Sequence, residues 1–145
     1  MSSLHYHVLC VDDDFDTCEV VQLSCPNIRF TFAHTFASGL RFIKSRVFDL
    51  YVLDTWLPDG SGLELCREIR RADSITPVIF LSAAAYVQDH QRAIDEGASA
   101  YLDKPSGLLR VEATIKDLIS EAESRRLSAK VAASPRCASL CKSSL

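Results

Sequence analysis

The sequence lacks any apolar run long enough to cross a membrane. Its N-terminal stretch MSSLHYHVLCVDDD meets three consecutive acidic residues before any apolar segment of signal-peptide length. No later stretch approaches the roughly 20 apolar residues that a membrane-spanning helix needs. The sequence therefore predicts a protein with no membrane segment, located in the cytoplasm.

Basic clusters are absent as well. Sixteen Lys and Arg residues stand against nineteen Asp and Glu residues, which gives a formal net charge of −3. No block of Lys and Arg forms the electropositive patch of a nucleic-acid-binding domain, and no basic helix of a helix-turn-helix follows the last apolar segment. We therefore expect no direct contact with nucleic acid.

Cysteines are present, but not in the spacing of metal sites or disulfide frameworks. The chain has six of them and no C-x-x-C pair. Four are scattered among apolar or helical segments, and two lie close to the C-terminus. We expect free thiols, not zinc ligands or disulfides, at Cys10, Cys18, Cys25, Cys66, Cys137 and Cys141.

What the sequence does contain is a regular alternation of short apolar runs and helical patterns. With 145 residues, 48% of them hydrophobic, the chain is long enough for one domain with a buried core. The stretches between the runs have about the length of crossover helices. The five runs comprise residues 7–11, 28–33, 50–53, 78–81 and 100–102.

Runs this apolar, without polar alternation, are typical of strands covered on both faces, as in the parallel sheet of an α/β domain. Crossover connections are right-handed, so the helices fall on both sides of the sheet. The last helix carries an apolar stripe from Leu108 to Ala122. We predict a doubly wound α/β domain over residues 1–127 and a flexible Ser- and Ala-rich tail or linker over residues 128–145.

Polar residues gather where these apolar runs end. In a doubly wound sheet, ligands bind outside the carboxyl ends of the strands. Acids follow the first and third runs, a hydroxyl and a small residue follow the fourth, and an acid, a lysine and a proline follow the fifth. These residues are Asp12, Asp13 and Asp14, then Asp54, then Ser82 and Ala83, and finally Asp103, Lys104 and Pro105.

Each of these residues has an ordinary structural explanation when taken alone. An Asp or Ser after a strand commonly caps a helix or forms a turn, as we expect for Asp14 or Asp16 and for Asp59 in its Pro-Asp-Gly turn. Several carboxylates at one edge, however, repel one another and need a counter-ion. A hard divalent cation such as Mg²⁺ suits oxygen ligands, and Lys104 supplies a further positive charge.

With these residues the chain resembles the receiver domain of bacterial two-component response regulators, over about residues 5–125. The resemblance implies the family's fold, a flavodoxin-like five-stranded parallel sheet of order 2-1-3-4-5 flanked by five helices. It rests on four motifs, VLCVDDD at 8–14, DLYVLDTWLPDGSGLEL at 49–65, PVIFLSA at 77–83 and GASAYLDKP at 97–105.

The resemblance also implies how a phosphoryl group is received. Asp54 matches the phosphoacceptor, and its donor is a phosphohistidine on a sensor histidine kinase or a phosphotransfer protein. Asp12 and Asp13 match the acid pair that holds Mg²⁺, or Mn²⁺ in its place. Asp54 and the backbone carbonyl of Trp56 complete the implied metal ligands.

The remaining motif residues match the groups that sense the phosphoryl group. Ser82, Ala83 and Lys104 match its binding groups, Ser82 and Tyr101 the switch pair, and Lys104 to Pro105 a cis peptide. In this family the switch alters a protein-interaction surface on the fourth helix, fifth strand and fifth helix. That surface is implied to contact a downstream protein target or a fused output domain, and it is a candidate face for a homodimer.

Two features depart from the family pattern. The segment from Asp12 to Ala33 is a couple of residues shorter than usual, with LSCPN where a longer first helix would run, so we expect a short partner-docking helix. Trp56, two residues after Asp54, is bulky at a position that in this family tunes how fast the phosphoryl group is lost.

Two other functions remain open on the sequence alone. Haloacid-dehalogenase-type phosphatases also combine an Asp nucleophile, a hydroxyl, a lysine and Mg²⁺, and Asp12 with Asp14 mimics their D-x-D motif. No late acid pair follows Lys104, however, and the chain is short for that fold. A receiver-like interaction module that is never phosphorylated is the other alternative. Such modules typically lose an acid or the lysine, and none is missing here.

Overall fold

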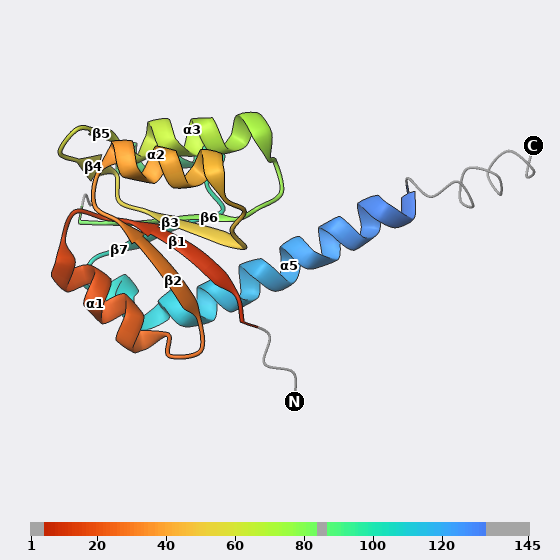
Figure 1. Cartoon of the computed structure of the whole chain (residues 1–145), viewed down its shortest axis with the longest axis horizontal. Coiled ribbons are helices and arrows are strands. Elements are labelled where there is room, and N and C mark those ends of the chain that lie inside the picture. The colour runs from red at the N-terminus through yellow and green to blue at the C-terminus, as the bar shows by residue number, and fades with distance from the viewer. Residues whose placement is uncertain (1–4, 84–86, 133–145) are drawn as a thin grey trace, which may run out of the picture.

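A five-stranded parallel sheet forms the centre of the protein (Figure 1). The computed structural model describes residues 5–83 and 87–132. The five strands coincide with the apolar runs of the sequence to within one residue at either end. They are β1 (His7–Val11), β2 (Arg29–Ala33), β3 (Leu50–Leu53), β6 (Val78–Ser82) and β7 (Ala100–Asp103).

The strand order of the sheet is β2-β1-β3-β6-β7, and all four neighbouring pairs are parallel. The predicted order 2-1-3-4-5 is therefore confirmed. The labels β4 (Trp56–Leu57) and β5 (Gly60–Ser61) belong to a two-residue antiparallel hairpin that follows β3 and lies outside the sheet. Because the order reverses between β1 and β3, the ends of these two strands border the crevice where doubly wound sheets bind ligands.

Helices cover both faces of the sheet, as predicted. In Figure 1, α2 and α3 lie on one side, and α1 and α5 lie on the other. A 3₁₀ helix at Ser106–Arg110 leads into α5. The helices are α1 (Phe15–Ser24), α2 (Phe36–Ser45), α3 (Gly62–Ala72), α4 (Val87–Asp95) and α5 (Val111–Ala132).

The core consists of two apolar clusters, one on each face of the sheet. Along β1, Val8 and Cys10 point to the cluster shared with α1 and α5, whereas Leu9 and Val11 point to the cluster shared with α2, α3 and α4. All four side chains are fully buried. Burial on both faces explains why β1 shows no alternation of polar and apolar residues.

Side-chain caps fix where the first three helices begin. The Asp14 carboxylate accepts a hydrogen bond from the amide of Asp16. Of the two candidate caps of α1, Asp14 and Asp16, it is therefore Asp14 that caps the helix. Ser61 caps α3 in the same way, and Thr35 forms a capping box with Ser38 at the start of α2. Asp59 lies in its turn, and its carboxylate also accepts from two amides in the first turn of α2.

The two terminal helices of the fold differ in length. Helix α1 has 10 residues and ends at Ser24, with Cys25 as its C-cap and Pro26 directly after. Helix α5 has 22 residues and runs to Ala132, past the predicted domain boundary at residue 127, and its last turns extend away from the sheet in Figure 1. Residues 133–145, with Cys137 and Cys141, lie outside the described residues.

The structure bears on two expectations from the sequence, the absence of a membrane-spanning helix and the free cysteines. Of the residues described, none belongs to a helix both long and apolar enough to cross a bilayer. Four cysteines in this part of the chain are free thiols, as predicted, and all four are buried. They are Cys10, Cys18, Cys25 and Cys66.

Candidate functional site: an acidic cluster bridged by a lysine

Three carboxylates meet at the carboxyl ends of the adjacent strands β1 and β3. One oxygen from each of Asp12, Asp13 and Asp54 lies within 4.8 Å of the others. Asp12 is buried and Asp13 is exposed, while the Asp54 side chain keeps 12% of its surface exposed. The predicted convergence of the acids is thus observed, and the cluster opens to solvent on the side of Asp13.

Lys104 follows the edge strand β7 and bridges two of these acids. Its ammonium lies 2.7 Å from Oδ2 of Asp12 and 3.3 Å from Oδ2 of Asp54. The residue follows β7 and precedes Pro105 across a cis peptide, as predicted. The Lys104 amide donates to the carbonyl of Ser82, which ties the loop after β7 to the end of β6.

Burial and mutual contact shift the pKa values of Asp12 and Lys104. Desolvation raises the pKa of Asp12 to about 6, and the nearby Asp54 charge adds to the rise. Hydrogen bonds from Lys104 and from the Asp14 amide oppose that shift without cancelling it. Burial also disfavours the charged form of Lys104, but hydrogen bonds and charge interactions with Asp12 and Asp54 outweigh burial and raise its pKa.

Two residues that the sequence analysis missed hold the backbone of Asp12. The Asp12 carbonyl accepts a hydrogen bond from Nδ1 of His34, at 2.9 Å, and a longer one from the Cys18 thiol, at 3.7 Å. A carbonyl oxygen can only accept, so Nδ1 of His34 carries the proton in this contact. His34 follows β2 and Cys18 lies in α1, so no local sequence pattern links either residue to Asp12.

A glycine allows the backbone after Asp54 to close tightly. A Cβ atom at Gly62 would lie 2.0 Å from the carbonyl oxygen of Asp54, so only glycine fits there. The Gly62 amide donates to the carbonyl of Thr55, and Thr55 itself is buried with its hydroxyl lacking a hydrogen-bond partner among the described residues. The start of α3 therefore packs directly against the turn that presents Asp54.

Trp56 lies beside the cluster through its backbone. Its amide is 3.4 Å from Oδ1 of Asp54, whereas its side chain, 59% exposed, extends into solvent. The backbone of Trp56 therefore borders the site, and its indole is not packed into the core.

The remaining predicted residues come from β6 and β7. Ser82 ends β6 and is buried, and Ala83 follows it in an exposed bend. Tyr101 lies in β7, half-buried, and its ring stacks on His90 of α4 at a centroid distance of 3.8 Å. His90 also lies 3.3 Å from the Asp103 carboxylate. Tyr101 therefore joins β7 to α4, on the face expected to carry the switch.

An acidic cluster with one bridging ammonium, at the carboxyl edge of such a sheet, can bind a hard cation and a polyanionic group together. The model of the response regulator receiver domain matches residues 8–116, from β1 into α5. This chain belongs to the response regulator receiver domain family. Receiver domains are signalling domains of two-component systems that generally bind Mg²⁺ at a cluster of acidic residues, and the rival phosphatase assignment is not supported.

Curated relatives include full-length regulators. The uncharacterized transcriptional regulatory protein YkoG of Bacillus subtilis is 35% identical over 112 residues, covering 76% of this chain and 49% of the relative. The KDP operon transcriptional regulatory protein KdpE of Escherichia coli is 39% identical over 103 residues, covering 71% of this chain and 43% of the relative. This receiver chain thus spans about half the length of the curated relatives it matches.

Solved structures of receiver domains match along nearly their whole length. A CheY-like receiver domain protein from Methanospirillum hungatei superimposes with a TM-score of 0.78 at 25% identity, covering 83% of this chain and 98% of that one. The non-phosphorylated HemR receiver domain from Leptospira biflexa gives a TM-score of 0.71 at 31% identity, covering 79% and 94%. The fold described above is thus the receiver fold.

Proposed function

We propose that Asp54 accepts a phosphoryl group from a phosphohistidine of a sensor histidine kinase or a phosphotransfer protein. The observation that carries this proposal is the position of Lys104, whose ammonium contacts both Asp12 and Asp54. A cation held between two carboxylates at an open rim is suited to neutralise an incoming phosphoryl group. Asp54 is the nucleophile because it follows the central strand and its side chain is partly exposed.

The donor set at this site fits Mg²⁺, and Mn²⁺ can substitute for it. Asp12, Asp13 and Asp54 provide hard oxygen ligands within reach of one another, and the backbone carbonyl of Trp56 is the proposed fourth protein ligand. The bound ion supplies positive charge that offsets the repulsion between the carboxylates and the phosphoryl oxygens.

The transfer itself needs positioned groups more than covalent chemistry. An oxygen of Asp54 forms a bond to phosphorus while the phosphorus–nitrogen bond of the donor histidine breaks, and the imidazole keeps that electron pair. The product on this chain is an aspartyl phosphate. The Lys104 ammonium, the Ser82 hydroxyl and the Ala83 amide bind the equatorial oxygens, where the charge develops.

Phosphorylation then changes a surface on α4, β7 and α5. Ser82 moves toward the phosphoryl group, and Tyr101 changes its packing in response, which biases two arrangements of that face. The His90 ring, stacked on Tyr101, moves with it. The altered face binds a downstream protein target or a fused output domain, and it is also the proposed face of a homodimer.

The chain also hydrolyses its own aspartyl phosphate, as its only turnover reaction. The Trp56 amide lies 3.4 Å from the Asp54 carboxylate, and its indole is exposed to solvent. A side chain of that size obstructs the approach of the attacking water, so the phosphorylated state is long-lived. Replacing Trp56 with Ala shortens this lifetime in a decay assay, whereas an unchanged lifetime counts against the obstruction.

Intact-mass measurement tests the phosphoacceptor. With acetyl phosphate and Mg²⁺, the wild-type chain gains one base-labile phosphoryl group and Asp54→Asn gains none. Asp16→Asn is the matched control, because Asp16 is exposed and its carboxylate has no hydrogen bond or ion pair among the described residues. It labels like the wild type. Equal labelling of the Asp54 variant rejects the assignment.

The metal site is tested separately by calorimetry and tryptophan emission without a phosphodonor. Mg²⁺ binds the wild type and changes the emission of Trp56, the only tryptophan in the chain. Asp13→Asn weakens binding by removing an exposed carboxylate that supports no part of the fold. An Asp13 variant that binds Mg²⁺ as tightly as the wild type removes Asp13 from the ligand set.

A further inference from the structure

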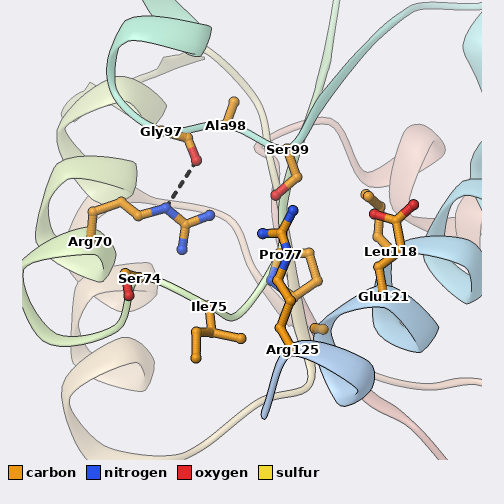
Figure 2. A pocket seen from close by; sticks show the side chains of 11 residues that line it. Arg70, Ser74, Ile75, Pro77, Gly97, Ala98, Ser99, Leu118, Glu121 and Arg125 are labelled. Atoms are coloured by element: carbon orange, nitrogen blue, oxygen red, sulfur yellow. Dashed lines mark hydrogen bonds between the residues drawn. The ribbon is translucent and has the colours of Figure 1, made fainter. Parts of the chain in front are cut away.

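A second pocket lies at the opposite edge of the sheet from the acidic cluster (Figure 2). It is bordered by the end of α3, by the segments that lead into β6 and β7, and by the middle of α5. Its volume is about 470 Å³, within the range of roughly 300 to 1,000 Å³ that small-molecule sites occupy. The proposed phosphorylation chemistry makes no use of it.

One wall of this pocket is held in place by Arg70 of α3. Its guanidinium donates to the carbonyls of Gly97, Asp73 and Thr76 at 2.9, 3.1 and 2.6 Å. Gly97 has a φ of +100°, and a Cβ there would lie 2.9 Å from Nε of Arg70, so the loop is shaped around the arginine. These contacts fix the wall before any ligand arrives, which lowers the entropic cost of binding.

The same arginine keeps one nitrogen available. Its three hydrogen bonds use Nε and Nη1, and within residues 5–83 and 87–132 no group accepts from Nη2. Arg125, one residue before the Arg126 that binds Thr76, has neither an ion pair nor a hydrogen bond to any described residue. Figure 2 shows the guanidiniums of Arg70 and Arg125 both directed into the space between α3 and α5.

Two hydroxyls and an apolar side complete the pocket. Ser99 accepts from the amide of Val78, so its own hydrogen remains to donate, and Ser74 lies exposed on the adjacent loop. Ile75 and Leu118 provide the apolar lining. Guanidinium and hydroxyl groups that line one pocket can donate hydrogen bonds to an anion with several oxygens, such as a phosphate. The apolar lining suits a hydrophobic group on the same ligand.

We infer that this pocket, defined by Arg70, Ser74, Ser99 and Arg125, binds a small phosphate monoester that carries an apolar body. Glu121, which also lines the pocket beside Leu118 (Figure 2), weakens binding of the anion and favours a ligand with a hydrogen-bond donor on its body. The inference is independent of phosphorylation at Asp54, because the site lies at the amino ends of β6 and β7.

Nuclear magnetic resonance titration of the full chain tests this inference with three probes of one shape. Phenyl phosphate, benzoate and benzyl alcohol share an aromatic ring and differ in charge. We expect phenyl phosphate to shift the amide signals of Ile75, Gly97 and Ser99 in a saturable manner, benzoate to bind more weakly, and benzyl alcohol to leave them unchanged. Shifts confined to Asp13 and Ala83 would place the probe at the acidic cluster and overturn the inference.

Charge variants give the second arm of the test. Arg125→Gln removes no contact seen in the structure, so the fold is retained, and it weakens phenyl phosphate binding about fivefold. Arg110→Gln makes the same charge change just before α5 and leaves binding unchanged. Glu121→Gln tightens binding by removing a repulsive charge. Equal affinity of the Arg125 variant and the wild type, or equal shifts by benzyl alcohol, would reject a phosphate site.

Discussion

The ammonium of Lys104 lies 2.7 Å from the Asp12 carboxylate, and both groups are largely withdrawn from solvent. The two residues come from opposite ends of the domain, one after β1 and the other after β7. Their contact spans β3 and β6, which lie between these strands, and Lys104 also lies 3.3 Å from Asp54. Removing the lysine therefore leaves two carboxylates facing each other with no cation between them.

Lys104→Met should destabilise the metal-free chain at pH 7 by about 2 kcal/mol or more, because one partner of a buried ion pair is left uncompensated. Mg²⁺ should restore much of the loss by replacing the missing charge. Lys116→Met is the control, since its ammonium lies 3.8 Å from Glu112 on the exposed face of α5, and such a pair contributes less than about 1 kcal/mol. Equal losses in urea unfolding would contradict a buried bridge.

The raised pKa of Asp12 predicts how the stability of the metal-free chain depends on pH. Its folded-state pKa of about 6 lies above the value of 3.8 for a free carboxyl, so the folded chain holds a proton there that the unfolded chain releases. This contribution is complete below about pH 4 and lost as pH rises through 6, by an amount on the order of 2 to 3 kcal/mol. The metal-free chain therefore gains stability from Asp12 as pH falls from 7 to 5.

Asp12→Asn isolates that contribution in urea unfolding with a chelator present. The variant lacks the proton uptake, so the difference in unfolding free energy between the two chains changes between pH 7 and 5. His7 acts in the opposite sense in the same range, because burial lowers its pKa and the unfolded chain then binds more protons. His7 is present in both chains and cancels. A pH-independent difference would show that Asp12 titrates elsewhere.

Gly62→Ala should destabilise the fold by about 2 kcal/mol or more, because the new methyl group meets the Asp54 carbonyl at 2.0 Å and backbone cannot yield cheaply. Gly39→Ala is the matched control within a helix. Its methyl group meets only side-chain atoms, those of Val11 at 3.0 Å and of Leu65 at 3.4 Å, and alanine favours the helix. Thermal melts that rank the two substitutions in the opposite order would contradict the close approach.

Thr55→Val should leave the stability unchanged or raise it by up to about 1 kcal/mol, because the buried hydroxyl has no hydrogen-bond partner among the described residues. Thr76→Val makes the same chemical change at a hydroxyl that donates a hydrogen bond to Asp73 and accepts one from Arg126. It should cost about 1 to 3 kcal/mol. Similar melting temperatures for both variants would mean that the Thr55 hydroxyl is hydrogen-bonded in solution.

The sequence by itself determined the sheet and the edge at which the site forms. The strands β1 and β3 begin and end where the apolar runs of residues 7–11 and 50–53 predicted. Both signals are local: runs that are apolar on both faces imply a parallel sheet, and parallel strands bring their carboxyl ends to one edge. Asp12 and Asp54 could therefore be placed together before their contacts were known.

Only the tertiary structure decided how the site residues differ from one another. Asp12 and Asp13 are adjacent and chemically equal in sequence, yet packing buries Asp12 and leaves Asp13 in solvent. Burial is the largest cause of the rise in the pKa of Asp12 to about 6. The hydrogen bond from His34 to the Asp12 carbonyl and the close approach of Gly62 to Asp54 join segments far apart in the chain. Such contacts depend on the packing of whole elements, which leaves no periodic signal in the sequence.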